Sequence, residues 1–191
     1  MCSNIKSPLS PIKNPKITPL RHHPTTLVLQ FFKHLDRNHP SYTHSPSSFD
    51  HAVDVAAHMR DFNSAWALVG RLRSLRLVPS PKTLAILAKR YASNDKPHRA
   101  VRTFLSMAEH RIRQDRHSFN TLLDILCKSK HVETTHSLLK TFKLRFRPDI
   151  VTYNILANGY CLIKRTLMAL RVLKEMVQRG IEPTMVKTQI E

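Results

Sequence analysis

The sequence predicts an all-α protein, an α-solenoid of paired antiparallel helices in 34–35-residue repeats. The first observation is that aligned residues recur along the chain at intervals of 34 or 35 positions. Three columns share this spacing: Ala65, Ala100, Thr135 and Ala169; Leu72, Met107, Phe142 and Met176; Pro79, Gln114, Pro148 and Pro183. Several columns with one spacing indicate stacked copies of a small unit that buries its apolar face only against neighbouring copies.

The second observation is helical periodicity within the last copy. Apolar residues mark one face of a first helix at i, i+3, i+4 and i+7, namely Tyr153, Leu156, Ala157 and Tyr160. A second apolar stripe follows, marked by Ala169, Leu173 and Met176. Gly180 can end this helix in a left-handed conformation, and Pro183 blocks its continuation. The unit is therefore two short helices joined by tight turns.

The spacing divides the chain into four complete copies. We predict repeats at 46–80, 81–115, 116–149 and 150–184, with residues 185–191 starting an incomplete fifth. A solenoid normally ends in a polar capping element, and 185–191 is too short to form one. We therefore expect the sequence to be a fragment of a longer array or a prematurely terminated product.

Residues 1–45 differ in composition from the repeats. They are rich in Pro, Ser, Thr, Lys and His, and they contain no acidic residue before Asp36. Such a leader resembles an organellar transit peptide, with a plain disordered tail as the alternative. Within it, residues 27–35 can form an amphipathic helix that either belongs to the presequence or caps the first repeat. The predicted localisation is the mitochondrion, with the plastid as the alternative.

The charge favours a polyanionic partner. Lys and Arg number 31 against 13 Asp and Glu, a formal net charge of +18. Nucleic acid is the first expected partner and a membrane surface the second. No apolar run approaches the roughly 18–20 residues of a membrane span, so no membrane insertion is expected.

No catalytic or metal-binding pattern is found. The chain has three cysteines without a CxxC pair, and its histidines form no HExxH-like cluster. The pattern His131-Val132-Glu133 lacks the second half of a zinc deaminase signature. Cys127 and Cys161 share a column with Ala57 and Ala92, which predicts a small, buried packing position. We therefore expect no enzyme activity, cofactor, metal or small-molecule substrate.

Several segments resemble the pentatricopeptide repeat. In the fourth copy they are Val151-Thr152-Tyr153-Asn154, Asn158-Gly159-Tyr160-Cys161 and the closing Gly180-Ile181-Glu182-Pro183. The third copy matches at residues 117–123 and 147–149, whereas the first two copies are degenerate. The resemblance covers residues 46–184 and implies a plant organellar factor of the pure "P" subclass. Such proteins bind single-stranded RNA, one base per repeat, in transcript processing, stabilisation or intron splicing.

The resemblance also implies which residues read bases. The readers would be Asn120 with Asp149, and Asn154 with Thr184; Ala85 with Asp115, and Asp50 with Ser80, are weak candidates. The Asn with Asp pair is similar to the family's uracil reader, and Asn with Thr suggests a pyrimidine. Val151 and His117 occupy the position that wedges against a base. The plain alternative is that Asn120 and Asn154 only cap or solvate their helices.

Basic residues near the end of each first helix are candidates for phosphate contacts: Lys89, Arg90, Lys128, Lys130, Lys164 and Arg165. The function expected from these observations is a sequence-selective, single-stranded RNA-binding adaptor that works with other RNA-processing proteins. The alternative is a tetratricopeptide-like protein-interaction solenoid or a ribosome-associated structural subunit. A tetratricopeptide array has a 34-residue period and a Trp-containing core motif, whereas this chain shows mostly 35 and lacks that motif.

Overall fold

The computed structural model describes residues 24–38 and 44–182, and within these ranges all regular secondary structure is helical. The first helices are α2 (Pro46–His58), α4 (Pro81–Ser93), α6 (Arg116–Lys128) and α8 (Ile150–Leu162). The second helices are α3 (Phe62–Ser74), α5 (Pro97–Leu105), α7 (Val132–Phe146) and α9 (Thr166–Gln178). The helix α1 (Pro24–Asn38) precedes them, and a 3₁₀ turn, η1 (Ser106–His110), extends α5.

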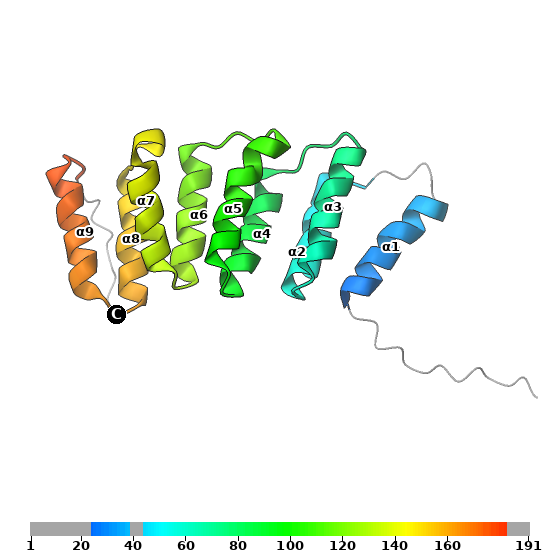
Figure 1. Ribbon diagram of the computed structural model, residues 1–191, viewed down its shortest axis with the longest axis horizontal. Coiled ribbons are helices and arrows are strands. Elements are labelled where there is room, and N and C mark those ends of the chain that lie inside the picture. The colour runs from blue at the N-terminus through cyan, green and yellow to red at the C-terminus, as the bar shows by residue number, and fades with distance from the viewer. Residues whose placement is uncertain (1–23, 39–43, 183–191) are drawn as a thin grey trace, which may run out of the picture.

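The helix pairs stand side by side in one row, as Figure 1 shows. The first helices contact one another in sequence, α2 with α4, α4 with α6 and α6 with α8. Each second helix packs mainly against the first helix of its own pair. The predicted all-α solenoid of paired helices is thus confirmed, and its first helices form one continuous layer.

Each first helix begins with a side-chain cap at an equivalent position of its repeat. Ser45 caps α2, Ser80 caps α4, Asp115 caps α6 and Asp149 caps α8. The last three form reciprocal capping boxes with the residue three positions on, which satisfies two backbone N–H groups at each start. The residue that ends one pair therefore sets the first turn of the next.

The turns use left-handed residues, and most of them are not glycine. Gly180 has φ 73°, as predicted for the end of the last helix. The turns between first and second helices place Arg60, Asp95, Lys130 and Lys164 at φ between 57° and 67°. A left-handed non-glycine residue costs about 1–2 kcal/mol. Basic side chains at helix C-termini offset part of that cost through the helix dipole.

The aligned columns form the core between the layers. The small column is buried throughout: Ala65, Ala100, Thr135 and Ala169. In the second column Leu72, Met107 and Met176 are buried, whereas Phe142 is only partly buried. Phe142 differs because Phe146 takes the buried place in the third pair, where it stacks on Phe119 at 4.6 Å. The predicted face of α8 is buried as well, at Tyr153, Leu156, Ala157 and Tyr160.

The helix α1 packs on the outer side of the first pair. Phe32 is buried, stacks on His44 at 4.0 Å and meets the edge of Phe49 at 5.2 Å. This position corresponds to the capping alternative for residues 27–35 (Figure 1). The rest of the predicted leader, apart from His44 and Ser45, lies outside the described residues, as do Thr184 and residues 185–191.

The expected buried cysteine column is correct for Cys127 and wrong for Cys161. Cys127 is buried beneath α8, and this burial raises the pKa of its thiol to about 11. Cys161 is exposed, because no described helix lies over its side of α8. The same position is therefore a packing site only where a following first helix covers it.

Candidate nucleic-acid interface

A hollow of about 520 Å³ opens between the starts of α6 and α8. Its lining brings together several residues singled out in the sequence: His117, Asn120, Asp149 and Val151. Arg116, which sequence reasoning missed, lines it too. Two neighbouring first helices thus bring four of the predicted RNA-contact residues to one place.

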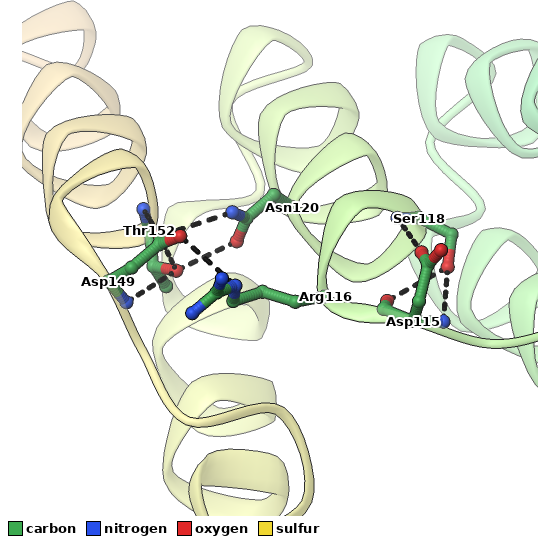
Figure 2. A network of polar contacts seen from close by, with 6 residues as sticks. All are labelled: Asp115, Arg116, Ser118, Asn120, Asp149 and Thr152. Atoms are coloured by element: carbon green, nitrogen blue, oxygen red, sulfur yellow. Dashed lines mark hydrogen bonds and ion pairs between the residues drawn. The ribbon is translucent and has the colours of Figure 1, made fainter.

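The floor of this hollow is a hydrogen-bonded network (Figure 2). Asn120 is only 7% exposed, and its Nδ2 donates to Asp149 Oδ1 at 3.3 Å. Its Oδ1 accepts from the Thr152 hydroxyl at 2.8 Å. Asn120 is therefore neither a helix cap nor a solvated side chain. Its amide keeps one N–H and one acceptor lone pair for another group.

The Asp149 carboxylate contacts Asn120, Thr152 and Arg116. The backbone N–H of Thr152 donates to its Oδ1 at 3.0 Å, and Arg116 Nε lies 3.1 Å from Oδ2. Burial alone would raise the pKa of this carboxyl, but the hydrogen bonds of Thr152 and Asn120 and the charge of Arg116 outweigh it. The pKa of Asp149 is therefore below its ordinary value. An ionised, oriented carboxylate borders the hollow near neutral pH.

Two exposed side chains flank the floor. His117 lies in the first turn of α6, and Val151, 49% exposed, lies in the first turn of α8. Both line the same hollow from opposite helices. A flat ring placed above Asn120 would therefore have an imidazole on one side and an aliphatic group on the other. The wedge role given to these two residues stays a prediction.

The first pair contains a related network with different chemistry. Asp50 on α2 is 7% exposed, and the Thr83 hydroxyl donates to its Oδ1 at 2.5 Å. The Ser80 hydroxyl lies 3.5 Å from both carboxylate oxygens. The structure thus brings Asp50 and Ser80 together as it does Asn120 and Asp149. Ionised, this carboxylate only accepts hydrogen bonds, whereas an amide also donates.

The two remaining candidate pairs are not joined in this way. Ala85 is half-buried on α4 and has no polar side-chain atom. Its partner Asp115 instead accepts the backbone N–H of Ser118 at 2.8 Å. That hydrogen bond contributes most to lowering the pKa of the Asp115 carboxyl. Asn154 is half-buried on α8, but its partner Thr184 lies outside the described residues.

Three of the six basic residues that we predicted to contact phosphate already form ion pairs with acidic residues of the protein. Arg90 forms a two-pronged ion pair with Asp54 on α2 at 2.8 and 2.9 Å. Lys128 pairs with Asp124 at 2.7 Å, and Arg165 pairs with Glu133. The other three, Lys89, Lys130 and Lys164, are exposed and form no ion pair among the described residues. Of the six, these three have no ion pair to break before they meet a phosphate.

Sequence reasoning missed the threonines that build both networks. Thr83 and Thr152 belong to the N-cap turns of the following helices, yet each donates a hydrogen bond to the predicted reader residue one repeat earlier, Asp50 or Asn120. A signal for them exists, because Thr83, Ser118 and Thr152 form a column with the repeat spacing. The contact itself depends on how close the first helices approach.

Neither a metal site nor a membrane span is found within 24–38 and 44–182. Among these residues no group of three or more His, Cys, Asp or Glu side chains could hold a metal ion. No described helix is both long enough and apolar enough to cross a bilayer.

Curated proteins with similar sequences carry one family name. The chain is 56% identical over 158 residues to the pentatricopeptide repeat-containing protein At1g74900, mitochondrial, of Arabidopsis thaliana, a match covering 83% of the chain and 33% of the relative. It is 33% identical over 171 residues to a second Arabidopsis thaliana protein, the pentatricopeptide repeat-containing protein At2g13420, mitochondrial. This match covers 87% of the chain and 32% of the relative. The chain thus spans about a third of these relatives. Their names agree with the predicted localisation, and we assign the chain to the mitochondrion.

Solved structures share the fold. The crystal structure of the pentatricopeptide repeat protein PPR10 from maize matches with a TM-score of 0.62 at 21% identity, over 85% of the chain and 23% of PPR10. A second structure, PPR10 in complex with an 18-nt psaJ RNA element, matches with a TM-score of 0.61, over 84% of the chain and 25% of PPR10.

A profile of the PPR repeat family matches residues 114–162 and 148–186, which contain the network at Asn120. This family consists of binding proteins rather than enzymes, in agreement with the expectation from the sequence. The profile, the relatives and the shared fold together show that the chain belongs to the pentatricopeptide repeat family.

Proposed function

We propose that the chain is a sequence-selective adaptor for single-stranded RNA that reads one base per repeat. The observation that supports this most is the hollow between α6 and α8. It combines a hydrogen-bonding floor at Asn120 and Asp149 with flanking side chains at His117 and Val151. Unstacked bases are commonly recognised by this combination of edge contacts and stacking.

We expect the floor of the hollow to fit a pyrimidine, with uracil preferred over cytosine. The free N–H of Asn120 can donate to a uracil carbonyl. Asp149 and Thr152 hold the amide so that this N–H is oriented before RNA arrives. Fixing a polar group in advance lowers the entropy cost of binding. Asn154 with Thr184 would read a second pyrimidine, with cytosine slightly preferred.

The cellular role we propose is mitochondrial RNA metabolism: transcript processing, stabilisation or intron splicing. The chain would act there by binding, with RNA and other RNA-processing proteins as partners. Two mitochondrial relatives and an RNA-bound member of the same fold support this role. The net charge of +18 supports a polyanionic ligand. We propose the repeat ranges 46–80, 81–115, 116–149 and 150–184 as its reading units.

The test is binding to nine-nucleotide adenosine RNA with one central uridine. We expect tighter binding than to the same RNA with a central adenosine, guanosine or cytidine. Asn120→Ala should reduce this preference about fivefold, the value of one hydrogen bond of about 1 kcal/mol. The matched control is Asn63→Ala, since Asn63 is exposed on α3 in the other layer.

Two results would count against the proposal. One is an unchanged base preference in Asn120→Ala, which would mean that another group selects the base. The other is affinity that does not fall with salt, because phosphate contacts release counterions and make binding salt-dependent.

A further inference from the structure

The second helices carry most of the positive charge of the helix pairs. Together with η1 they contain nine Lys and Arg against three Asp and Glu, whereas the first helices contain five against three. The reading sites proposed above lie on the first helices, so they do not account for this excess. A concentration of one sign of charge attracts partners of the opposite sign. Base reading therefore leaves the charge of the second-helix layer unexplained.

Two equivalent hollows open beside the second helices. One, of about 320 Å³, is lined mainly by α5 and η1 and reaches Trp66 on α3. The other, of about 340 Å³, is lined mainly by α7 and the end of α9. Trp66 in the first hollow and His136 in the second occupy the same repeat position, and so do His110 and Arg179. The first helices pack against one another along the row, whereas consecutive second helices within the described residues do not, which leaves room for these hollows.

The hollow at Trp66 has a polar floor with unused hydrogen-bonding groups. Trp66 Nε1 donates to the Tyr91 hydroxyl at 2.9 Å, and Tyr91 is only 5% exposed. The Tyr91 O–H donates to no group within the part of the chain that the structure describes. His110 stacks on Trp66 with ring centres 6.0 Å apart, and its buried Nδ1 has no hydrogen-bond partner among those residues either. Buried polar groups nearly always have a partner, so this floor suits a ligand that accepts a hydrogen bond.

Two arginines border this floor. Arg99 and Arg102 lie one turn apart on α5, and both are exposed. Neither forms an ion pair with another described residue. A guanidinium group can bind a carboxylate through two parallel hydrogen bonds. Together with the Tyr91 O–H, this set of donors fits a carboxylate.

Both hollows also contain a carboxylate beside their cations. Glu109 lines the first hollow, and Glu175 lines the second, where it pairs with Arg179 at 2.9 Å. Lys140 and Lys143 are further exposed cations of the second hollow. RNA carries a negative charge at every nucleotide and would bring like charge to both carboxylates. A protein segment can place acidic side chains at the cations and neutral ones at the carboxylates, so the mixture of charges favours a protein.

We propose that the second-helix layer binds a protein segment in which acidic side chains are separated by neutral ones. Its main contact is the hollow at Trp66, where Arg99 and Arg102 pair with carboxylates of the segment and the Tyr91 O–H donates to one of them. The second hollow, two repeats further on, extends the surface. The inference builds on the proposed adaptor function by naming the surface for a protein partner. It does not depend on base reading, since RNA would lie on the other layer.

The test uses a sixteen-residue peptide that repeats Glu-Ala-Ala-Ala, with a control peptide that has Gln in place of Glu. Trp66 is the only tryptophan of the chain, so its fluorescence reports on the hollow. We expect the Glu peptide to change this fluorescence at low salt and the Gln peptide to leave it unchanged. Prior binding of the nine-nucleotide adenosine RNA with its central uridine should not prevent the change, because the two ligands occupy different layers.

Two double variants with equal loss of charge locate the two ligands. Arg99→Gln/Arg102→Gln removes two cations of the hollow, whereas Lys82→Gln/Lys89→Gln removes two exposed cations from α4, the first helix of the same repeat. The arginine variant should weaken peptide binding about fivefold, the value of two exposed ion pairs, and should change RNA affinity less than about twofold. The lysine variant should lower RNA affinity and leave peptide binding within about twofold. Thermal unfolding checks that both variants fold.

Three results would refute this surface. The first is no fluorescence change with the Glu peptide, since a segment bound elsewhere would not reach Trp66. The second is equal weakening of peptide binding in the two variants, which would mean that only overall charge matters. The third is a larger loss of RNA affinity in the arginine variant than in the lysine variant, which would place RNA on the second helices. If the uridine preference is absent but the peptide results hold, base reading fails and the protein surface stands.

Discussion

The proposed reader positions of the first and third repeats have the same hydrogen-bonded arrangement but different side chains. Asp50 and Asn120 are equally buried, and each accepts a hydrogen bond from a threonine at the start of the next first helix. In both repeats the last residue completes the contact, Ser80 in one case and Asp149 in the other. The backbone arrangement around the proposed reading site at Asn120 is therefore retained in a repeat whose sequence is degenerate.

The difference lies in which groups remain to meet a ligand. The Asn120 amide has a free donor and a free acceptor, whereas an ionised Asp50 carboxylate offers acceptors only. A negative charge in the first-helix layer also opposes an approaching phosphate. The fold thus retains this arrangement, and the side chain at the position sets which hydrogen-bonding groups are left for a ligand. Four predictions test this comparison.

The largest expected effect comes from making the third repeat resemble the first. Asn120→Asp places a second carboxylate beside Asp149 in a site only 7% exposed. The new group should have a raised pKa in the folded state, so its penalty grows as pH rises above the unfolded value near 4 and levels off above the folded value. We expect a loss of about 3 kcal/mol or more in unfolding free energy at neutral pH. Urea unfolding at pH 5 and pH 8 measures it.

The control for that variant is Asn63→Asp, at an exposed position in the first turn of α3. There an added negative charge meets the positive end of the helix and should be neutral or slightly stabilising. Equal losses in the two variants would mean that the contact with Asp149 is not what makes the charge unfavourable.

The next effect concerns the close approach of α6 and α8, which brings Asn120 to Thr152. A Cβ added at Gly159 would lie 2.5 Å from Cys127 Sγ and 3.3 Å from a Val132 methyl group. Gly159→Ala should therefore cost about 1–3 kcal/mol in stability. Gly70→Ala is the matched control, because that Cβ meets nothing within 4 Å. It should stabilise α3 by about 0.5–1 kcal/mol.

The third prediction makes the first repeat resemble the third. Asp50→Asn keeps an acceptor for the Thr83 hydroxyl and adds a donor. We expect RNA affinity to rise a few-fold, by about 1 kcal/mol or less, together with a new base preference at that repeat. Binding to RNA with single-base changes along its length measures both. Higher affinity without any base preference would show that only the charge matters there.

The smallest effect is on acid stability. The pKa of Asp149 is lowered in the folded state, so its contribution is complete above the unfolded value near 4. That contribution is lost as pH falls through the folded value. Asp149→Ser, which copies the Ser80 cap of α4, should keep the cap but remove this acid-dependent stability. Urea unfolding at pH 5 and pH 3 should therefore show a shallower decline in the variant.

Much of the fold could be predicted from the sequence, because stacked repeats bury the same columns in every copy. The buried face at Tyr153 and Leu156 and the left-handed Gly180 follow from local pattern alone. The exposure of Cys161 could not be predicted this way, since it depends on which helix covers that end of α8. The ion pair of Arg90 with Asp54 depends on the spacing between two first helices.

The candidate site was only half visible in the sequence. Family resemblance placed Asn120 and Asp149 together, and the structure joins them by a hydrogen bond. The resemblance gave no sign that Thr152 binds the Asn120 amide or that Arg116 binds the Asp149 carboxylate. The resemblance gave Ala85 only as a weak candidate, and it could not show the open space beside this residue, which is a property of packing and not of residue type.

The most direct test of base reading at Asn120 is a photocrosslink. The probe is the nine-nucleotide adenosine RNA with 4-thiouridine in place of its single uridine. Irradiation and mass spectrometry should place the crosslink on residues lining the α6–α8 hollow, His117 or Val151 first. In the Asn120→Ala variant the crosslinks should be distributed over other residues as well. Crosslinks found mainly on α3, α5, α7 or α9 would contradict base reading by the first-helix layer.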